Sequence, residues 1–199
     1  MADYKSRSAG RLWRVAFCIG RALLVAYAVH VVNALSGHRL DLLGVRPRSL
    51  VGLVGIPLHP FLHGSLGHLL VNSLPFAVLG GLVAARGVGE WVEVSLFVIL
   101  FEGAALWIFG DGGSVYLGAS GLIMGYFGYL VGRGWYERAP VSIAVAAAVV
   151  VAYGGLLFSV LPVSTTASWL GHLLGLVGGF LAAWLEFAQM KSSARSEPL

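Results

Sequence analysis

The stretch Gly118-Ala-Ser-Gly-Leu-Ile-Met-Gly125 opens a short apolar segment that ends near residue 132. A helix needs about 20 apolar residues to cross the hydrocarbon core of a bilayer, which is about 30 Å thick. The roughly 14 residues from Ser120 onward would cover only about 21 Å. In a membrane, this helix should therefore begin about 10 Å below one surface. The glycine-rich chain before it would then re-enter the membrane, where exposed backbone is tolerated only next to protein or water.

The composition indicates that the whole chain belongs in a membrane. Its 199 residues are 58% hydrophobic and only 11% charged, and the mean hydropathy is +0.84. An average soluble domain carries about 25% charged residues, so a soluble α/β domain is a poor fit. We expect an all-α, single-domain membrane protein with six apolar spans, at roughly 15–35, 65–85, 91–109, 118–132, 141–161 and 168–188.

The basic residues predict an orientation, and they do not indicate a nucleic-acid partner. The pI is near 9.5, but the lysines and arginines lie between apolar segments, where they report membrane topology. Six spans put both termini on one side, and nine of the 13 basic residues share that side, which is therefore expected to be cytoplasmic. These nine are Lys5, Arg7, Arg11, Arg14, Arg86, Arg133, Arg138, Lys191 and Arg195.

The first apolar segment is expected to be a retained helix. It is longer than a typical signal h-region of about 7–15 residues, and Arg21 interrupts it. We expect a cytoplasmic N-terminal segment at 1–14, a six-helix domain at 15–188 and a cytoplasmic tail at 189–199, disordered from Lys191. The N-terminus does not resemble a transit peptide, which favours a prokaryotic plasma membrane. Cys18 is the only cysteine, so no internal disulfide can form.

Four polar residues are predicted to share the outer leaflet. With the N-terminus inside, the segments 65–85, 118–132 and 168–188 all run from outside inward. His68 and Asn72 lie near the start of the first, Ser120 near the start of the second and His172 near the start of the third. The topology alone therefore brings these four side chains to one depth.

Ser120 and His172 are the simplest pair for acyl transfer, which needs a nucleophile with a base in hydrogen-bond reach. No acidic residue lies in the segment of Ser120, and the segment of His172 has none before Glu186, so the pair would be a dyad without a triad acid. The alternative is that the glycines only pack helices and that Ser120 bonds back to a carbonyl. The small residues that would let these helices approach closely are Gly121 and Gly125 on one, and Gly171, Gly175, Gly179 and Ala183 on the other.

His68 and Asn72 are four residues apart and share one helix face. Both can donate hydrogen bonds, which suits an oxyanion hole completed by the backbone N–H of Ser120. A metal site formed by His59, His63 and His68 is the alternative, but Pro60 disfavours a helical His59–His63 pair, and no carboxylate lies nearby. We expect no metal, and we expect His63 to cap or brace the loop.

Two further features are expected to be structural. The residues from about 50 to 62 are apolar but are broken by glycine and proline, so they predict an interfacial or half-inserted segment. Glu102 lies inside the span 91–109, where a carboxyl group is costly. The sequence names no partner for it. Packing against a neighbouring helix is our interpretation, and an ion path is the alternative.

These residues make the chain resemble the rhomboid intramembrane serine proteases. The matching motifs are His63-Gly-Ser-Leu-Gly-His68-Leu-Leu-Val-Asn72, Gly118-Ala-Ser120-Gly121 and Gly171-His172-Leu-Leu-Gly175 through Gly179. Three separated motifs agree in order and spacing, over nearly the whole chain.

The resemblance implies a six-transmembrane-helix rhomboid bundle whose fourth helix starts behind a re-entrant loop. It implies Ser120 as nucleophile and His172 as general base, with His68, Asn72 and the backbone of Ala119 and Ser120 as the oxyanion hole. Rhomboids cleave peptide bonds in or near transmembrane segments, without metal or cofactor. The substrate would enter sideways, beside the segment 141–161, into a water-filled cavity capped by the loop near Pro162.

The chain also departs from the well-studied bacterial rhomboids. These have a tyrosine four residues after the serine that stacks on the catalytic histidine, and Met124 stands at that position here. Methionine can contact the ring but fixes it less firmly. Two other functions remain open: a catalytically silent rhomboid-like protein that binds membrane clients, and a small transporter or metal channel. The expected partners are transmembrane protein substrates and the lipid bilayer. The sequence does not predict an oligomeric state.

Overall fold

The computed structural model describes residues 2–162 and 169–196, and this part of the chain is helical, with no β-strand. The all-α fold is therefore confirmed. Three short 3-10 helices accompany the α-helices, namely η1 (Arg39–Leu43), η2 (His59–Phe61) and η3 (Gly154–Val160). The α-helices are α1 (Ala2–Leu35), α2 (Leu50–Leu58), α3 (Leu66–Ala84), α4 (Val88–Phe109), α5 (Ser120–Glu137), α6 (Pro140–Tyr153) and α7 (Trp169–Ser196).

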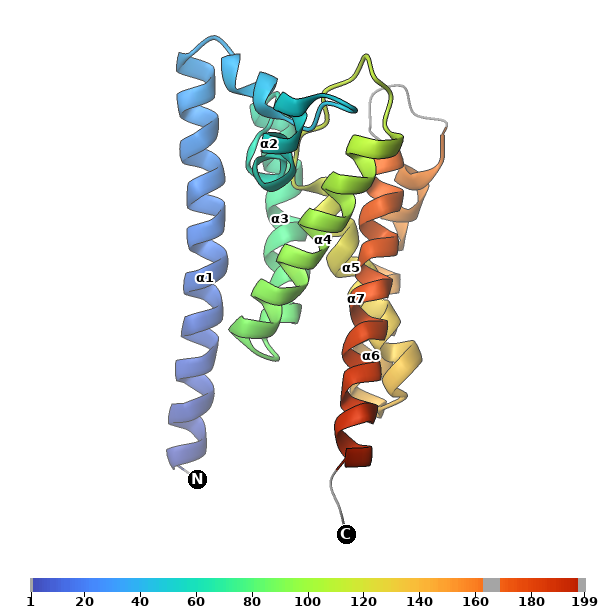
Figure 1. The fold of residues 1–199 in the computed structure, drawn as a ribbon. Coiled ribbons are helices and arrows are strands. Elements are labelled where there is room, and N and C mark those ends of the chain that lie inside the picture. Colours follow the sequence, from blue (N-terminus) through green and yellow to red (C-terminus); the bar gives the residue numbers. More distant parts are fainter. Residues whose placement is uncertain (1, 163–168, 197–199) are drawn as a thin grey trace.

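Six of these helices correspond to the six expected apolar segments. Helices α1, α3, α4 and α7, together with α6 and its continuation η3, are long and apolar enough to cross a membrane. The sixth, α5, is the short helix that begins at Ser120. Figure 1 shows the two ends of the chain at the same end of the bundle, as an even number of spans requires.

The structure differs from the expected boundaries at both termini. Helix α1 begins at Ala2 and α7 continues to Ser196, so the expectation of disorder from Lys191 is wrong as far as residue 196. Gln189, Met190 and Lys191 have unbranched side chains, which lose little freedom in a helix. The Lys191 ammonium also lies 4.8 Å from the ring centre of Phe187, one turn earlier. Residues 197–199 lie outside the described part.

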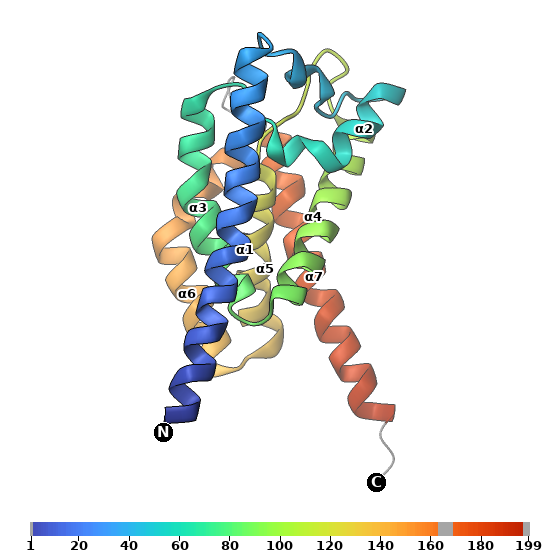
Figure 2. The same ribbon diagram turned by 90° about the vertical axis from the view of Figure 1, so that its left-hand side faces the viewer.

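Helix α5 lies at the centre of the bundle and packs against α3, α4, α6 and α7. Its contact with α7 is made by backbone atoms. A Cβ added at Gly175 would collide with the carbonyl oxygen of Gly121, and one added at Gly179 would collide with that of Gly125. The close approach predicted from the glycine stripe is therefore confirmed. Helix α1 packs mainly along α3 at the periphery (Figure 2).

The chain between α4 and α5 descends into the bundle before α5 begins (Figure 1). Two hydrogen bonds hold it to the chain before α2: the N–H of Val45 donates to the carbonyl of Tyr116, and the N–H of Tyr116 donates to the carbonyl of Val45, both at 2.9 Å. The N–H of Gly118 donates to the carbonyl of His59 at 2.8 Å. This path agrees with the expected re-entrant loop, and it gives the descending backbone protein partners.

The apolar residues 50–62 form α2 and η2, which do not cross the bundle. Helix α2 packs against α4, where a Cβ at Gly103 would lie only 2.8 Å from Ile56 Cγ2. The segment therefore covers one side of α4 and carries His59 toward the start of α5.

A polar cluster joins three helices at the end where the termini lie. Arg133 of α5 is only 4% exposed. Its guanidinium contacts Glu90 of α4 at 2.9 Å, Glu186 of α7 at 3.7 Å and Glu137 of α5. Tyr129 donates a hydrogen bond to Glu90 at 2.7 Å. One of the basic residues counted for orientation thus also fastens the bundle.

Replacing Gly179 by alanine should destabilise the bundle, because its methyl group would force α5 and α7 apart. We expect a loss of about 1–3 kcal/mol, as for other overpacked cores, measured as unfolding in detergent micelles. Gly81→Ala is the matched control, since nothing lies within 4 Å of an added Cβ there. Equal stability of the two variants would contradict the backbone contact.

Replacing Arg133 by alanine should also destabilise the fold, because three carboxylates would lose their buried cation and keep only the exposed Arg86. We expect a loss of up to about 3 kcal/mol, at the low end for breaking a buried pair, since the carboxylates are partly exposed. The same unfolding measurement on Arg14→Ala, an exposed arginine of α1, should show no change. An unchanged Arg133→Ala protein would mean that the cluster is not stabilising.

Candidate active site

A cavity of about 650 Å³ lies at the start of α5, between α3, η3 and α7. Its lining includes Ser120, His172, His68 and Asn72. The structure therefore brings together the four side chains that the topology argument assigned to one depth. The cavity is also lined by the loop residues from Val115 to Leu117. The predicted capping loop after Pro162 falls in residues 163–168, outside the described part.

Ser120 is the first residue of α5, and the turn before it depends on a glycine. Gly118 has φ +116°, in the region that favours glycine. A Cβ at this position would also lie 2.6 Å from Cε1 of His68. Because Gly118 has no side chain, the imidazole of His68 can lie directly against the turn that leads to Ser120. The first N–H groups of α5, including that of Ser120, have no partner within the helix.

The N–H of Ala119 is directed away from this cavity. It donates to Nε2 of His63 at 3.4 Å. Burial and the neighbouring His68 lower the pKa of His63 to about 4, so this ring is neutral and can accept the bond. His63 therefore braces the loop, as expected. The expected oxyanion role of the Ala119 backbone does not fit this arrangement, because its N–H already has a partner.

His172 is oriented by a backbone carbonyl. Its Nδ1 lies 3.2 Å from the carbonyl oxygen of Ser159 in η3. A carbonyl can only accept, so the proton is on Nδ1 and Nε2 is left as the basic nitrogen. In a Ser-His-Asp triad the aspartate fixes this same tautomer. This contact could not be predicted from the sequence, because a main-chain acceptor in a 3-10 turn has no residue signature.

Ser120 and His172 face one cavity, but no hydrogen bond joins them within residues 2–162 and 169–196. The backbone contact between Gly121 and Gly175 fixes their helices within one turn of both residues. Met124, four residues after Ser120, is buried and lines the same cavity. Catalytic hydrogen bonds are often long before substrate binds.

His68 and Asn72 lie on the same face of α3. The helix begins beside them, where the side chain of Ser65 accepts a hydrogen bond from the N–H of His68 at 3.1 Å. The side-chain nitrogen of Asn72 is buried and has no hydrogen-bond partner in the described part of the chain. An unpaired buried donor is costly, so this amide is available to a ligand in the cavity.

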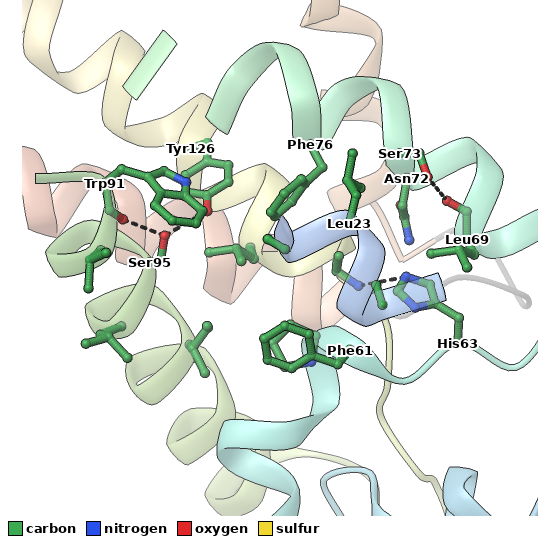
Figure 3. A pocket seen from close by; sticks show the side chains of 18 residues that line it. Leu23, Phe61, His63, Leu69, Asn72, Ser73, Phe76, Trp91, Ser95 and Tyr126 are labelled. Atoms are coloured by element: carbon green, nitrogen blue, oxygen red, sulfur yellow. Dashed lines mark hydrogen bonds between the residues drawn. The ribbon is translucent and has the colours of Figure 1, made fainter. Parts of the chain in front are cut away.

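A second pocket, of about 180 Å³ and almost wholly apolar, lies between α1, α3, α4 and α5. Figure 3 shows Asn72 and His63 at one end of it and Trp91 and Tyr126 at the other. At the far end Ser95 Oγ and Tyr126 Oη lie 2.7 Å apart and hydrogen-bonded. Asn72 lines both this apolar pocket and the cavity at the start of α5.

The three neighbouring histidines, His59, His63 and His68, have different surroundings. His59 Nδ1 lies 2.8 Å from the carbonyl oxygen of Ile56, and its Nε2 lies 3.6 Å from Oε2 of Glu102. His63 bonds Ala119, and His68 faces the cavity. In the described residues no three His, Cys, Asp or Glu side chains converge on one point. Glu102, for which no partner could be predicted from the sequence, is therefore paired with His59.

A model of the Rhomboid domain matches residues 50–189, which is more than half of the chain. The chain belongs to the rhomboid family. Its relatives include an uncharacterized protein of Mycobacterium tuberculosis, 36% identical over 167 residues that cover 80% of this chain and 70% of the relative. An uncharacterized protein of Mycobacterium leprae is 36% identical over 171 residues, covering 82% and 68%. The matched region of this rhomboid contains every residue that lines the cavity at the start of α5.

Proposed function

We propose that this rhomboid is an intramembrane serine endopeptidase that hydrolyses peptide bonds in or near transmembrane segments of other membrane proteins. The observation that carries the proposal is the convergence of Ser120, His172, His68 and Asn72 on one cavity at the start of α5. The Nδ1–H tautomer of His172 supports it further, because that tautomer leaves Nε2 able to take a proton.

In this mechanism Ser120 Oγ attacks the carbonyl carbon of the scissile bond, and His172 Nε2 takes the hydroxyl proton. The C–N bond then breaks, and Nε2 returns the proton to the leaving amine. The acyl group stays on Ser120 as an ester. Water attacks this ester with the same base, which releases the carboxylic acid and restores the serine. No metal or cofactor takes part in these steps.

The oxyanion that forms at the substrate carbonyl needs donors that are already in position. The amide nitrogen of Asn72, the ring of His68 and the backbone N–H of Ser120 are the candidates. The Ala119 N–H is left out because it bonds His63. In the free protein, the unpaired Asn72 amide costs stability that a bound oxyanion would recover.

We also propose that the termini face the cytoplasm of a cell whose plasma membrane holds the protein. The excess of basic residues on the terminal side supports this orientation. The cavity would then open toward the extracytoplasmic side. Substrate segments would reach it from the bilayer beside α6, since α6 with η3 is the span least covered by the rest of the described protein.

A catalytically silent rhomboid that binds membrane clients is the second candidate. One observation favours it: no hydrogen bond links Ser120 to His172 in the part of the chain that the structure describes. A silent protein would not activate its serine, so reaction with an electrophilic probe separates the two functions.

A fluorophosphonate probe should label the wild-type protein in detergent or liposomes, because an activated serine attacks phosphorus readily. Ser120→Ala should abolish labelling, and His172→Ala should slow it by several orders of magnitude, since base and nucleophile act as a unit. Ser114→Ala, in the exposed loop before α5, is the matched control and should label normally. Labelling that survives Ser120→Ala would refute this nucleophile.

Asn72→Ala should lower kcat by about 10²–10³, as for the loss of one oxyanion donor, with a smaller change in KM. The measurement is cleavage of a membrane-anchored substrate, with thermal unfolding to verify the fold. Ser73→Ala, the next residue of α3, whose hydroxyl bonds the carbonyl of Leu69, serves as the control. Unchanged turnover by Asn72→Ala would remove Asn72 from the oxyanion hole.

A further inference from the structure

Glu102 and His59 form a buried polar pair that the proposed mechanism does not use. Glu102 lies on α4 and is 3% exposed, and His59 opens η2 and is 1% exposed. His59 Nε2 and Glu102 Oε2 are 3.6 Å apart. Neither atom has a hydrogen-bond partner in the described residues. Burying a carboxyl group this deeply costs free energy that a leucine at the same position would not cost. Its presence therefore calls for a role that only a carboxyl group can fill.

The contacts of His59 orient its ring toward Glu102. The carbonyl of Ile56, 2.8 Å from Nδ1, can only accept, so Nδ1 donates to it. Nε2 is then directed at Oε2 of Glu102, and the pair joins η2 to α4.

This pair touches the chain on both sides of Ser120. The carbonyl of His59 accepts the N–H of Gly118, two residues before the serine, at 2.8 Å. The carboxyl group of Glu102 lies against Gly121, the residue after the serine, so closely that a Cβ at Gly121 would overlap it. The turn that carries the nucleophile is therefore held between the two partners.

The contact also reaches the helix of the base through the backbone. Gly121, against which the carboxyl group of Glu102 lies, packs on Gly175 of α7, three residues after His172. A shift of Gly121 would therefore displace the helix of the base as well as that of the nucleophile.

We propose that Glu102 is a positioning residue of the Ser120–His172 dyad: paired with His59, it holds the turn of the nucleophile in place and, through Gly121 and Gly175, the helix that carries His172. This inference rests on the proposed function, because it assigns Glu102 a role in acyl transfer. It also explains why a carboxyl group is present in the apolar interior of α4.

The test compares Glu102→Gln and Glu102→Leu with wild type, using substrate cleavage and the rate of fluorophosphonate labelling. We expect kcat to fall about 10–100-fold with little change in KM, because the substrate does not touch Glu102. The labelling rate should fall by a similar factor, because the probe reacts with the serine whose turn Glu102 holds. Glu93→Gln, an exposed glutamate of the same helix, is the matched control for both measurements.

A double variant separates positioning from packing. Replacing both partners, as Glu102→Leu with His59→Phe, leaves no unpaired buried group. We expect its kcat to be no lower than that of either single variant, but still below that of the wild type. Thermal unfolding of each protein verifies that it is folded. If the leucine variant does not fold, the comparison of the isosteric Glu102→Gln with wild type is sufficient to test the proposal.

The outcomes distinguish this inference from the proposed function. A wild-type protein that does not label would defeat the function itself. Wild-type labelling with an unchanged kcat and an unchanged labelling rate in Glu102→Gln would overturn only the role of Glu102. A lower kcat accompanied by an equal rise in KM, or by a loss of folded protein, would limit Glu102 to a structural role and would also overturn the proposal.

Discussion

Helices α5 and α7 touch through their backbones, and the arrangement of the candidate site depends on this contact. Gly121 and Gly125 on one helix meet Gly175 and Gly179 on the other, where a methyl group on α7 would collide with a carbonyl oxygen of α5. Hydrophobic burial cannot drive helices together inside lipid, so close van der Waals packing of small residues has to do so. Because the contact lies within one turn of both Ser120 and His172, it brings a hydroxyl and an imidazole from distant parts of the chain to one cavity.

The two ends of α5 are held by different chemistry. At its start, the descending loop forms backbone hydrogen bonds with Val45 and with the carbonyl of His59, and glycine at position 118 leaves space for the ring of His68. At its end, Arg133 is surrounded by carboxylates from three helices. The central helix is thus fixed by geometry near the cavity and by ion pairs near the termini, with apolar packing between.

Much of this arrangement could be predicted because it depends on spacing and periodicity within short segments. The four-residue interval between His68 and Asn72 predicts a shared helix face. The glycine stripe near His172 predicts close helix packing, and the short segment after Ser120 predicts a helix that begins inside the membrane. The remainder depends on contacts between distant segments. The Ser159 carbonyl that orients His172 is a main-chain atom, the partner of Glu102 comes from a 3-10 turn some forty residues away, and the Ala119 N–H turns to His63 because of the loop's path.

The orientation of His172 by the Ser159 carbonyl has a consequence for mutational surveys. Every amino acid contributes the same carbonyl group, so exchanging the side chain at position 159 leaves the acceptor intact. Alanine scanning would therefore not detect the carbonyl group that sets the tautomer of His172. Its result would suggest a Ser120–His172 pair without any orienting group. Only a change in the path of η3, or a chemically altered peptide bond, would reveal it.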